Sequence, residues 1–206
     1  MLKVKTDKVT KTVVRLARQR GVLRPRDLAP LGIPRRHLTQ LTTTGVLWHS
    51  GRGLYRLADA PVNEHHSLAE AARRVTGGIV CLLSALRFHR LTTQNAWEVW
   101  LAITPTSRKP KVDYPPIRIV RFSGAAFLEG IEYHRIENVD VRVYSAAKTV
   151  ADCFKYRNKI GISVAIEALR DAWRNKSASA DQLWHFAKVC RVANVMRPYM
   201  DTVIGS

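Results

Sequence analysis

Hydrophobic residues recur at a helical period through the N-terminal part of the chain, with polar residues on the other face of each expected helix. A first helix is expected over residues 6–19, and a short second helix around Leu28 stops at Gly32. Pro34 follows at a position where the start of a helix tolerates a missing N–H group. The pattern therefore predicts two helices joined by a turn at Gly32 and Ile33, behind a supporting first helix.

The helix after that turn has one apolar face and one polar face. Leu38 and Leu41 continue an apolar stripe that must face a core. The opposite face carries the polar side chains Arg35, Arg36, Thr39, Gln40 and Thr43. Arg and Gln side chains match base edges in the major groove, while Thr suits phosphates or the thymine methyl group. The pattern is typical of a recognition helix that reads duplex DNA.

The spacing changes to that of a β-hairpin after Gly45. Strands are expected over residues 46–48 and 54–57, around a turn with Arg52 at its tip, and Leu23 is expected in a short strand beside them. These elements predict a winged helix-turn-helix domain over residues 1–62. A winged helix can also serve as a docking unit for another protein, so the motif alone leaves both functions open.

Residues 63–206 predict a second domain with a different pattern. A helix capped by Asn63 or Ser67 is followed by an apolar run over residues 79–88, which predicts a buried helix. Four alternating segments predict strands, with a proline-rich loop between the first two: residues 97–103, 117–122, 131–136 and 139–144. We therefore expect a small mixed or antiparallel sheet.

The C-terminal part of the chain returns to a helical period. Ser145 is expected to cap one helix, and further helices are expected over residues 161–173 and 179–190. A final helix over residues 192–203 is expected to break near Pro198. The predicted fold class is α+β, with an N-terminal winged helix-turn-helix domain and a helix-rich α+β C-terminal domain.

The net charge of the chain indicates what kind of partner it binds. Lys and Arg together number 34 against 16 Asp and Glu, which gives a formal net charge of +18 and a pI near 10.6. Residues 1–60 alone carry a balance of +10, so the density is highest around the predicted winged helix. A polyanionic partner is the natural inference. Because the sequence has no long apolar run, signal peptide or lipidation motif, we expect no membrane partner and a cytoplasmic location.

The sequence offers little for catalysis. Three cysteines in apolar segments, Cys81, Cys153 and Cys190, are expected to be buried free thiols, and His65 and His66 lack the partners that a zinc site needs. No metal and no cofactor are assigned. The common nucleotide-binding, metalloprotease and hydrolase motifs are absent, and Asp152 is interpreted as a surface or capping residue of a helix. We therefore do not expect an enzyme.

Several longer stretches resemble one protein family. The segments LARQRGVLRPRDL, GVLWHSGRGLYRL, CLLSALRFHRLTTQ, WEVWLAI and above all VRVYSAAKTVADCFKYRNKIG are similar to the AbiEi antitoxins of type IV toxin–antitoxin systems. The resemblance implies a bacterial antitoxin whose N-terminal domain binds inverted repeats of double-stranded DNA in its own promoter and represses a bicistronic operon. Its partner would be an AbiEii-like toxin that resembles nucleotidyltransferases, opposed without a stable complex.

Under this resemblance we assign residues to roles. Base readout is expected from Arg35, Arg36, Thr39 and Gln40, and contacts to the DNA backbone are expected from Arg24, Arg26, Arg52 and Thr43. The C-terminal domain is expected to present a basic patch to toxin, RNA or flanking DNA, formed by Arg118, Arg121, Arg142, Lys148, Lys155, Arg157 and Lys159. The alternative function is a winged-helix transcription regulator or docking adaptor unrelated to any toxin.

Overall fold

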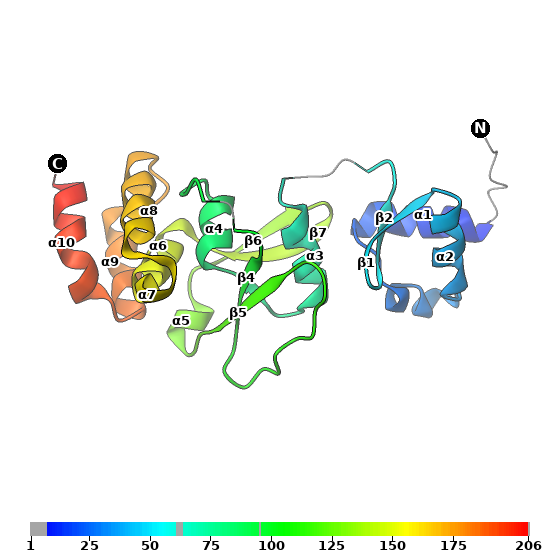
Figure 1. The fold of residues 1–206 in the computed structure, drawn as a ribbon, viewed down its shortest axis with the longest axis horizontal. Helices are drawn as coiled ribbons and strands as arrows, with labels where there is room; N and C mark the ends of the chain where they lie inside the picture. Colours follow the sequence, from blue (N-terminus) through cyan, green and yellow to red (C-terminus); the bar gives the residue numbers. More distant parts are fainter. Residues whose placement is uncertain (1–7, 61–63, 95, 206) are drawn as a thin grey trace. The chain divides into compact units, whose positions relative to one another are not determined.

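The structure is a computed structural model that describes residues 8–60, 64–94 and 96–205 (Figure 1). By its internal contacts the chain divides into two units. The first comprises residues 1–76, 111–115 and 135–141, and the second comprises residues 77–110, 116–134 and 142–206. The expected domain boundary after residue 62 and the expected cap Asn63 lie outside the described residues, so both stay predictions.

The first unit begins with helices and continues into a β-hairpin. Its elements are α1 (Lys8–Arg20), the 3-10 turns η1 (Pro25–Asp27) and η2 (Ala29–Leu31), α2 (Arg36–Thr43), β1 (Leu47–Gly51), β2 (Leu54–Leu57) and α3 (His66–Arg74). Gly32 ends η2 with a φ of +63°, a left-handed conformation that suits glycine, and Gly45 follows α2 with a φ of +73°. The order of helices followed by strands is as predicted.

The short helix expected around Leu28 differs in detail, because it consists of the two 3-10 turns. Pro25 and Pro30 each lack the N–H group that a continuous α-helix through this stretch would use. Pro34 also stands just before α2 and not inside it, although its carbonyl accepts a hydrogen bond from the N–H of His37 at 3.1 Å. The turn at Gly32 is therefore entered through tight 3-10 geometry.

The core of the first unit lies where these elements meet. Leu38 and Leu41 of α2 are buried together with aliphatic side chains of α1, the turns and the hairpin. Leu23 joins the hairpin as predicted, since it exchanges backbone hydrogen bonds of 2.7 and 3.0 Å with Tyr55. Leu31 of η2 does not join this core and is 48% exposed.

A five-stranded mixed sheet follows in the order β5-β4-β3-β7-β6. Its strands are β3 (Ile79–Val80), β4 (Val99–Ile103), β5 (Ile117–Arg121), β6 (Ile131–Ile136) and β7 (Val139–Tyr144). The pair β3/β4 is antiparallel, whereas β3/β7 and β4/β5 are parallel. The prediction of a small mixed or antiparallel sheet is confirmed in its mixed form.

The helix expected over residues 79–88 is wrong at its start. Ile79 and Val80 form the middle strand β3, where Ile79 pairs with Ala102 and Val80 pairs with Leu101. The helix α4 begins only at Leu82, after Cys81 in extended conformation. A continuous apolar run fits both a buried strand and a buried helix, so its periodicity could not separate them. The two β-branched residues were the available signal.

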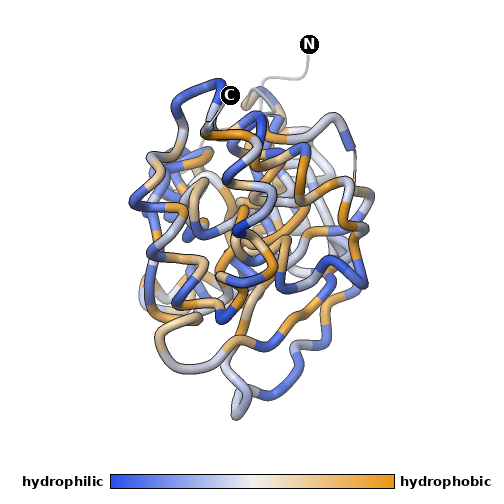
Figure 2. Tube along the Cα trace, turned by 90° about the vertical axis from the view of Figure 1, so that its left-hand side faces the viewer, coloured by the Kyte–Doolittle hydropathy of each residue, from blue (hydrophilic) through white to orange (hydrophobic). Residues whose placement is uncertain are grey.

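Helices complete the second unit. They are α4 (Leu82–Phe88), α5 (Ala125–Leu128), α6 (Ala146–Lys155), α7 (Arg157–Ile160), α8 (Ile162–Arg174), α9 (Ala180–Val189) and α10 (Ala193–Ile204). Helix α6 packs against α4, α8, α9 and α10 (Figure 1). Hydropathy changes repeatedly along the chain in Figure 2, as expected for helices that are apolar on one face. No helix of the described residues is long and apolar enough to cross a membrane.

The cap predicted at Ser145 is confirmed, and Ser179 caps α9 in the same way, although this cap was not predicted. Ser145 and Ser179 accept hydrogen bonds from the backbone N–H groups of Lys148 and Gln182, respectively. The break expected near Pro198 does not occur, since α10 runs through it. Met196 and Met200 on either side of Pro198 are buried in the core, and this packing offsets the hydrogen bond that the proline cannot donate.

Helix α6 contains a buried ion pair between two residues that lie one helical turn apart, Lys148 and Asp152. The Nζ atom of Lys148 donates to both carboxylate oxygens of Asp152 at 2.7 and 2.6 Å, and both side chains are essentially inaccessible to solvent. The ammonium group also lies over the rings of Tyr144 and Phe122 at 4.1 and 4.8 Å. Burial raises the pKa of the Asp152 carboxyl, and the charge of Lys148 opposes this effect. Asp152 is therefore a core residue, and its interpretation as a surface or capping residue is wrong.

Replacing Lys148 with Ala should lower the free energy of unfolding by about 3–5 kcal/mol, because it leaves a buried carboxylate without its partner. Urea denaturation of the two proteins measures the difference. The control is Lys155→Ala on the same helix, where the side chain is exposed and the change should stay within about 0.5 kcal/mol. Equal effects at the two positions would contradict a structural role for the pair.

Candidate nucleic-acid interface

The exposed face of α2 carries the side chains that the sequence assigned to DNA. Arg35, Arg36, Thr39, Gln40 and Thr43 are all exposed, while Leu38 and Leu41 on the opposite face are buried. The spacing of three and four residues brings Arg36, Thr39 or Gln40, and Thr43 onto one face of the helix. The hydroxyl of Thr43 donates to the carbonyl of Thr39 at 3.1 Å and keeps its oxygen as an acceptor.

The start of α2 is strongly electropositive. Arg35 forms the N-cap without a side-chain hydrogen bond to the helix, and the first turn contains no acidic residue. Two guanidinium groups therefore stand at the end of the helix where the backbone N–H groups already carry partial positive charge. A cation is disfavoured at this end, so an anion bound here would relieve repulsion between the arginines and the helix.

The β-hairpin presents a further arginine at its tip. Arg52 lies between β1 and β2 with its side chain 87% exposed, and its Nη1 atom is 3.7 Å from Oδ2 of Asp113. Ion pairs as exposed as this one contribute little, roughly 0–1 kcal/mol, and do not hold the side chain in place. Arg52 thus stays accessible to a polyanion. Trp48 on β1 is also exposed, with 58% of its surface accessible.

Arg24 and Arg26 differ sharply in exposure. Arg26 is exposed, whereas the side chain of Arg24 is only 18% exposed and lies 3.5 Å from the carboxylate of Asp27. Arg24 also donates from Nη1 to the backbone carbonyl of Arg73, and its own N–H group donates to Asp27 at 2.8 Å. Arg24 is therefore held by the protein itself, so less of its side chain is open to DNA than that of Arg26, and its contact to the DNA backbone stays a prediction.

Asp27 is the centre of an arginine cluster that sequence reasoning missed. Its carboxylate is 4% exposed and pairs with Nη1 of Arg20 at 3.0 Å and with Nη2 of Arg73. Burial lowers the pKa of Arg73; the charge of Asp27 opposes this, while that of Arg20 reinforces it. The available signal was that Asp27 is the single acidic residue between Asp7 and Asp59, in a stretch rich in arginine.

A second buried group ties α3 to the turn between β6 and β7. Nδ1 of His66 lies 2.6 Å from Oε2 of Glu137, and Nε2 lies 3.2 Å from Oε1 of the fully buried Glu70. The interaction with Glu70 raises the pKa of His66, Glu137 adds to this effect, and burial opposes it. The residues lie far apart in sequence, so no local pattern announced them.

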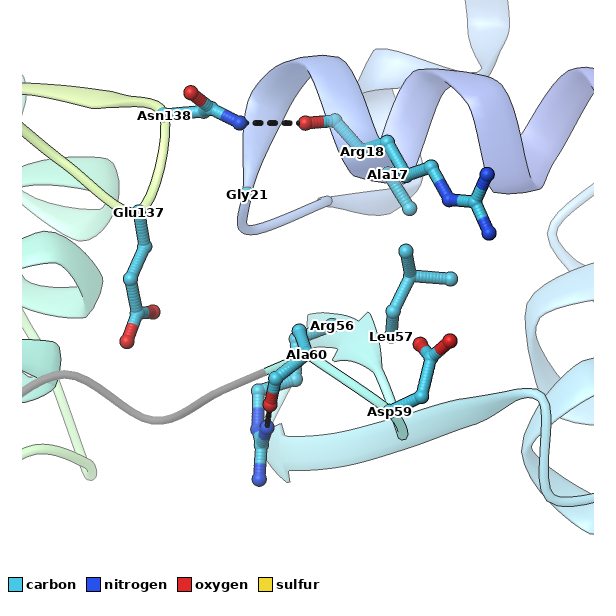
Figure 3. A pocket seen from close by; sticks show the side chains of 9 residues that line it. All are labelled: Ala17, Arg18, Gly21, Arg56, Leu57, Asp59, Ala60, Glu137 and Asn138. Atoms are coloured by element: carbon cyan, nitrogen blue, oxygen red, sulfur yellow. Dashed lines mark hydrogen bonds between the residues drawn. The ribbon is translucent and has the colours of Figure 1, made fainter.

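A cavity of about 420 Å³ lies beside this turn (Figure 3). Asn138 donates from Nδ2 to the carbonyl of Arg18 at 2.7 Å, and Arg56 donates to the carbonyl of Ala60 at 3.1 Å. Arg18 and Arg56 are balanced in its lining by Asp59 and Glu137. The cavity therefore has no charge preference that would select a ligand.

The basic patch expected in the second unit is only partly at the surface. Lys148 must be removed from it, because its side chain is fully buried against Asp152. Arg118 pairs with Glu98 and lies over the ring of Trp100. The Nη1 atom of Arg121 donates to the carbonyls of three residues in the proline-rich loop, at 2.7–2.9 Å: Thr104, Pro105 and Ser107. Both arginines are exposed, but each bonds to neighbouring residues of the chain, so less of its charge is available to a partner.

The remaining residues of the patch lie on β7 and around the end of α6. Arg142 is half-buried, and Arg157 donates to the carbonyl of Phe154 at 3.0 Å. Lys155 and Lys159 are exposed, with the Lys159 ammonium group 5.5 Å from the centre of the Tyr156 ring. The part of the patch that offers charge to a partner is therefore centred on the two lysines.

The cysteines are buried free thiols, as predicted. Burial raises the pKa of Cys81 and Cys153 well above the ordinary value and that of Cys190 to about 12. Nucleophilic chemistry needs the thiolate form, which these surroundings disfavour. Asp152, one of the carboxylates weighed for catalysis, is enclosed by the core and does not reach solvent.

Comparison with known families bears on the first unit. The family model described as "Transcriptional regulator, AbiEi antitoxin" matches residues 11–58. The resemblance to AbiEi antitoxins is thereby confirmed over this segment, which contains α2, the hairpin and Asp27. A search of curated proteins finds no match to the chain. The match supports a role in regulation or as an antitoxin.

The raised pKa of His66 predicts how stability depends on pH. Its contribution is fully present below the unfolded pKa of about 6.5 and is lost as pH rises through the higher folded value. The free energy of unfolding, measured by urea denaturation, should therefore fall as pH rises from about 6.5 toward 8. His66→Gln should flatten this slope, whereas the control Gln40→Ala, which removes an exposed side chain of α2 that does not titrate, should keep it. A slope that survives His66→Gln would contradict the assignment.

Proposed function

We propose that this chain is a cytoplasmic antitoxin and transcriptional autorepressor of a type IV toxin–antitoxin operon. Residues 1–62 form a winged helix-turn-helix domain that binds inverted repeats of double-stranded DNA in its own promoter. The observation that carries the proposal is the row of exposed Arg, Thr and Gln side chains on α2, inside the segment that matches the AbiEi regulators.

The arrangement of elements supports the winged-helix assignment. Helix α1 precedes the turns η1 and η2, the left-handed Gly32 leads into α2, and the β1–β2 hairpin follows. The backbone bridge between Leu23 and Tyr55 adds the short third strand expected beside such a hairpin. In this geometry α2 is the recognition helix that enters the major groove, and the hairpin is the wing.

The proposed roles follow from side-chain chemistry and exposure. Arg35, Arg36, Thr39 and Gln40 read base edges from α2. Arg26, Arg52 and Thr43 contact the phosphate backbone, which positions the domain without reading sequence. Arg24 is less accessible than these residues, because Asp27 and the carbonyl of Arg73 engage it. A balance of +10 over residues 1–60 supports DNA over an uncharged partner.

The alternative function, a docking adaptor unrelated to a toxin, has one observation in its favour. Trp48 is exposed on the hairpin, and tryptophan is enriched in protein interfaces. An adaptor has little need of so high a positive charge density, so DNA binding is the better account. Partner capture that fails in an Arg35→Ala/Arg36→Ala variant with unchanged promoter affinity would favour the adaptor.

The second unit counters the toxin in this proposal. The partner is a nucleotidyltransferase-like toxin, opposed without a stable complex, and the action needs no cofactor or catalysis by this chain. Support comes from Lys155 and Lys159, which remain exposed at the end of α6 and on α7 while other members of the predicted patch are engaged by the protein. A basic surface of this kind suits an acidic protein surface or RNA.

Replacing Arg35 and Arg36 with Ala should lower affinity for the promoter duplex at least about tenfold, because each guanidinium that reads a guanine contributes about 1–3 kcal/mol. Fluorescence anisotropy with promoter and random duplexes measures both affinity and specificity. Arg170→Ala, at an exposed position of α8, is the control and should change neither. Weak binding by the native chain, equal for the two duplexes, would rule out sequence-specific repression.

Arg52→Ala should behave differently from the α2 variant. Because a wing contact to phosphate carries no sequence information, its loss should weaken binding to all duplexes alike. The slope of log K against log salt should fall by about 1, measured over a salt titration. A change confined to the promoter duplex would instead assign base readout to Arg52.

Lys155→Glu combined with Lys159→Glu should reduce protection against the toxin expected from the neighbouring gene, because it reverses charge at the exposed part of the patch. Growth of bacteria that co-express toxin and antitoxin is the readout. Lys188→Glu with Arg191→Glu, two exposed positions at the end of α9, is the matched control and should protect fully. The Arg35→Ala/Arg36→Ala variant should also protect, which separates the two functions. Full protection by the Lys155/Lys159 variant would assign toxin control elsewhere.

A further inference from the structure

Another cavity in the first unit, of about 340 Å³, has four arginines among the ten residues that line it. Arg20 and Arg24 come from the end of α1 and the segment that follows it, Arg73 comes from α3, and Arg135 comes from β6. Its volume falls in the range of small-ligand sites, roughly 300–1,000 Å³. No residue of α2 lines it, so this site is separate from the proposed base-reading face.

The cavity carries more positive charge than its surroundings neutralise. Asp140 lies in its lining, and three of the lining arginines, Arg20, Arg24 and Arg73, pair with the carboxylate of Asp27. Four guanidinium groups against these two carboxylates leave an excess of two positive charges. Arg24 and Arg73 are largely buried whereas Arg20 and Arg135 are exposed, so part of this excess is desolvated, and an anion would offset its cost.

The arginines also have donors that the protein does not satisfy. The Nε atoms of Arg24 and Arg73 have no hydrogen-bond partner among the described residues, and because they expose almost no surface, an anion in the cavity reaches them only if the side chains shift. Buried donors without acceptors are expensive, at roughly 1–3 kcal/mol each, and natural proteins rarely retain them without a reason. Asp27 already accepts from Arg20, from Arg73 and from the N–H group of Arg24, so it has little capacity left.

We propose that this cavity binds a phosphate group. Planar guanidinium groups match phosphate oxygens in pairs, and a phosphate monoester carries a charge of about −1.5 to −2, close to the excess on the arginines. A single carboxylate, or one phosphodiester of the DNA backbone, carries one negative charge and would compensate half of that excess, but only the phosphate also matches the guanidinium groups with several oxygens. The phosphate belongs either to a free phosphate ester or to the DNA backbone, and the site itself does not rest on the proposed repressor function.

Arg135 gives the test that leaves the fold intact. Its side chain is exposed and makes no hydrogen bond or ion pair with another described residue, in contrast to Arg20, Arg24 and Arg73, which hold Asp27. Arg135→Glu therefore alters the charge of the cavity without breaking the cluster. Arg170→Glu, at an exposed position of α8 outside the cavity, makes the same change of charge and is the control.

The first measurement is the thermal midpoint of the full chain in inorganic phosphate and in chloride at matched ionic strength. Phosphate should raise the midpoint of the native chain and of Arg170→Glu by a few degrees, and that of Arg135→Glu by much less, because a ligand of the folded state stabilises it. An equal rise in both variants would show that phosphate acts as a general stabilising salt. It would overturn the proposal if the duplex measurement described next is also independent of residue 135.

The second measurement separates the sources of the phosphate. A salt titration of duplex binding by the two variants should give equal slopes if the site takes a free phosphate ester, and a slope lower by about 1 in Arg135→Glu if it takes a backbone phosphate. Equal slopes support a site for a free ester only if the rise of the thermal midpoint in phosphate depends on Arg135. A lower slope in Arg135→Glu supports a site for a backbone phosphate. If neither measurement depends on Arg135, the cavity does not bind phosphate, and this failure leaves base reading by α2 untouched.

Discussion

A single buried carboxylate, that of Asp27, offsets the repulsion between several arginines of the first unit. Asp27 collects guanidinium groups from α1, from the segment before η1 and from α3, in the most basic part of the chain. Without it these arginines would repel each other at a site that is already partly desolvated. Asp27 thus fixes the path from α1 into η1, while the placement of α2 also depends on the buried Leu38 and Leu41.

The second unit uses the same device in a more deeply buried form. Lys148 and Asp152 neutralise each other inside α6, where the rings of Tyr144 and Phe122 complete the surroundings of the ammonium group. Basic residues in this chain therefore fall into two classes, those that stabilise the protein and those that face solvent. Net charge counts both, so a charge of +18 overstates the surface available to a polyanion.

Local patterns predicted the parts of the fold that local forces determine. The apolar stripe of α2 with its exposed arginines follows from helical spacing, and Gly32 and Gly45 mark its flanks because glycine tolerates left-handed backbone. The burial of Arg24 was not predictable in this way, since its partner Arg73 is 49 residues away in sequence. The continuity of α10 through Pro198 likewise depends on tertiary packing, which outweighs a local preference.

The arginine cavity and α2 are linked through the segment that contains Asp27. One site influences the other only under a condition that follows from this link. A ligand in the cavity stabilises the folded unit by mass action, whatever happens at α2. Such stabilisation does not alter DNA affinity unless the ligand binds the DNA-bound and DNA-free arrangements with different strength. Asp27 ends η1 and Gly32 follows five residues later, so a change at the Asp27 cluster reaches α2 only if it also moves the backbone of this segment. Coupling therefore requires that phosphate change the geometry of the Asp27 cluster, since occupancy alone would stabilise the protein without regulating it.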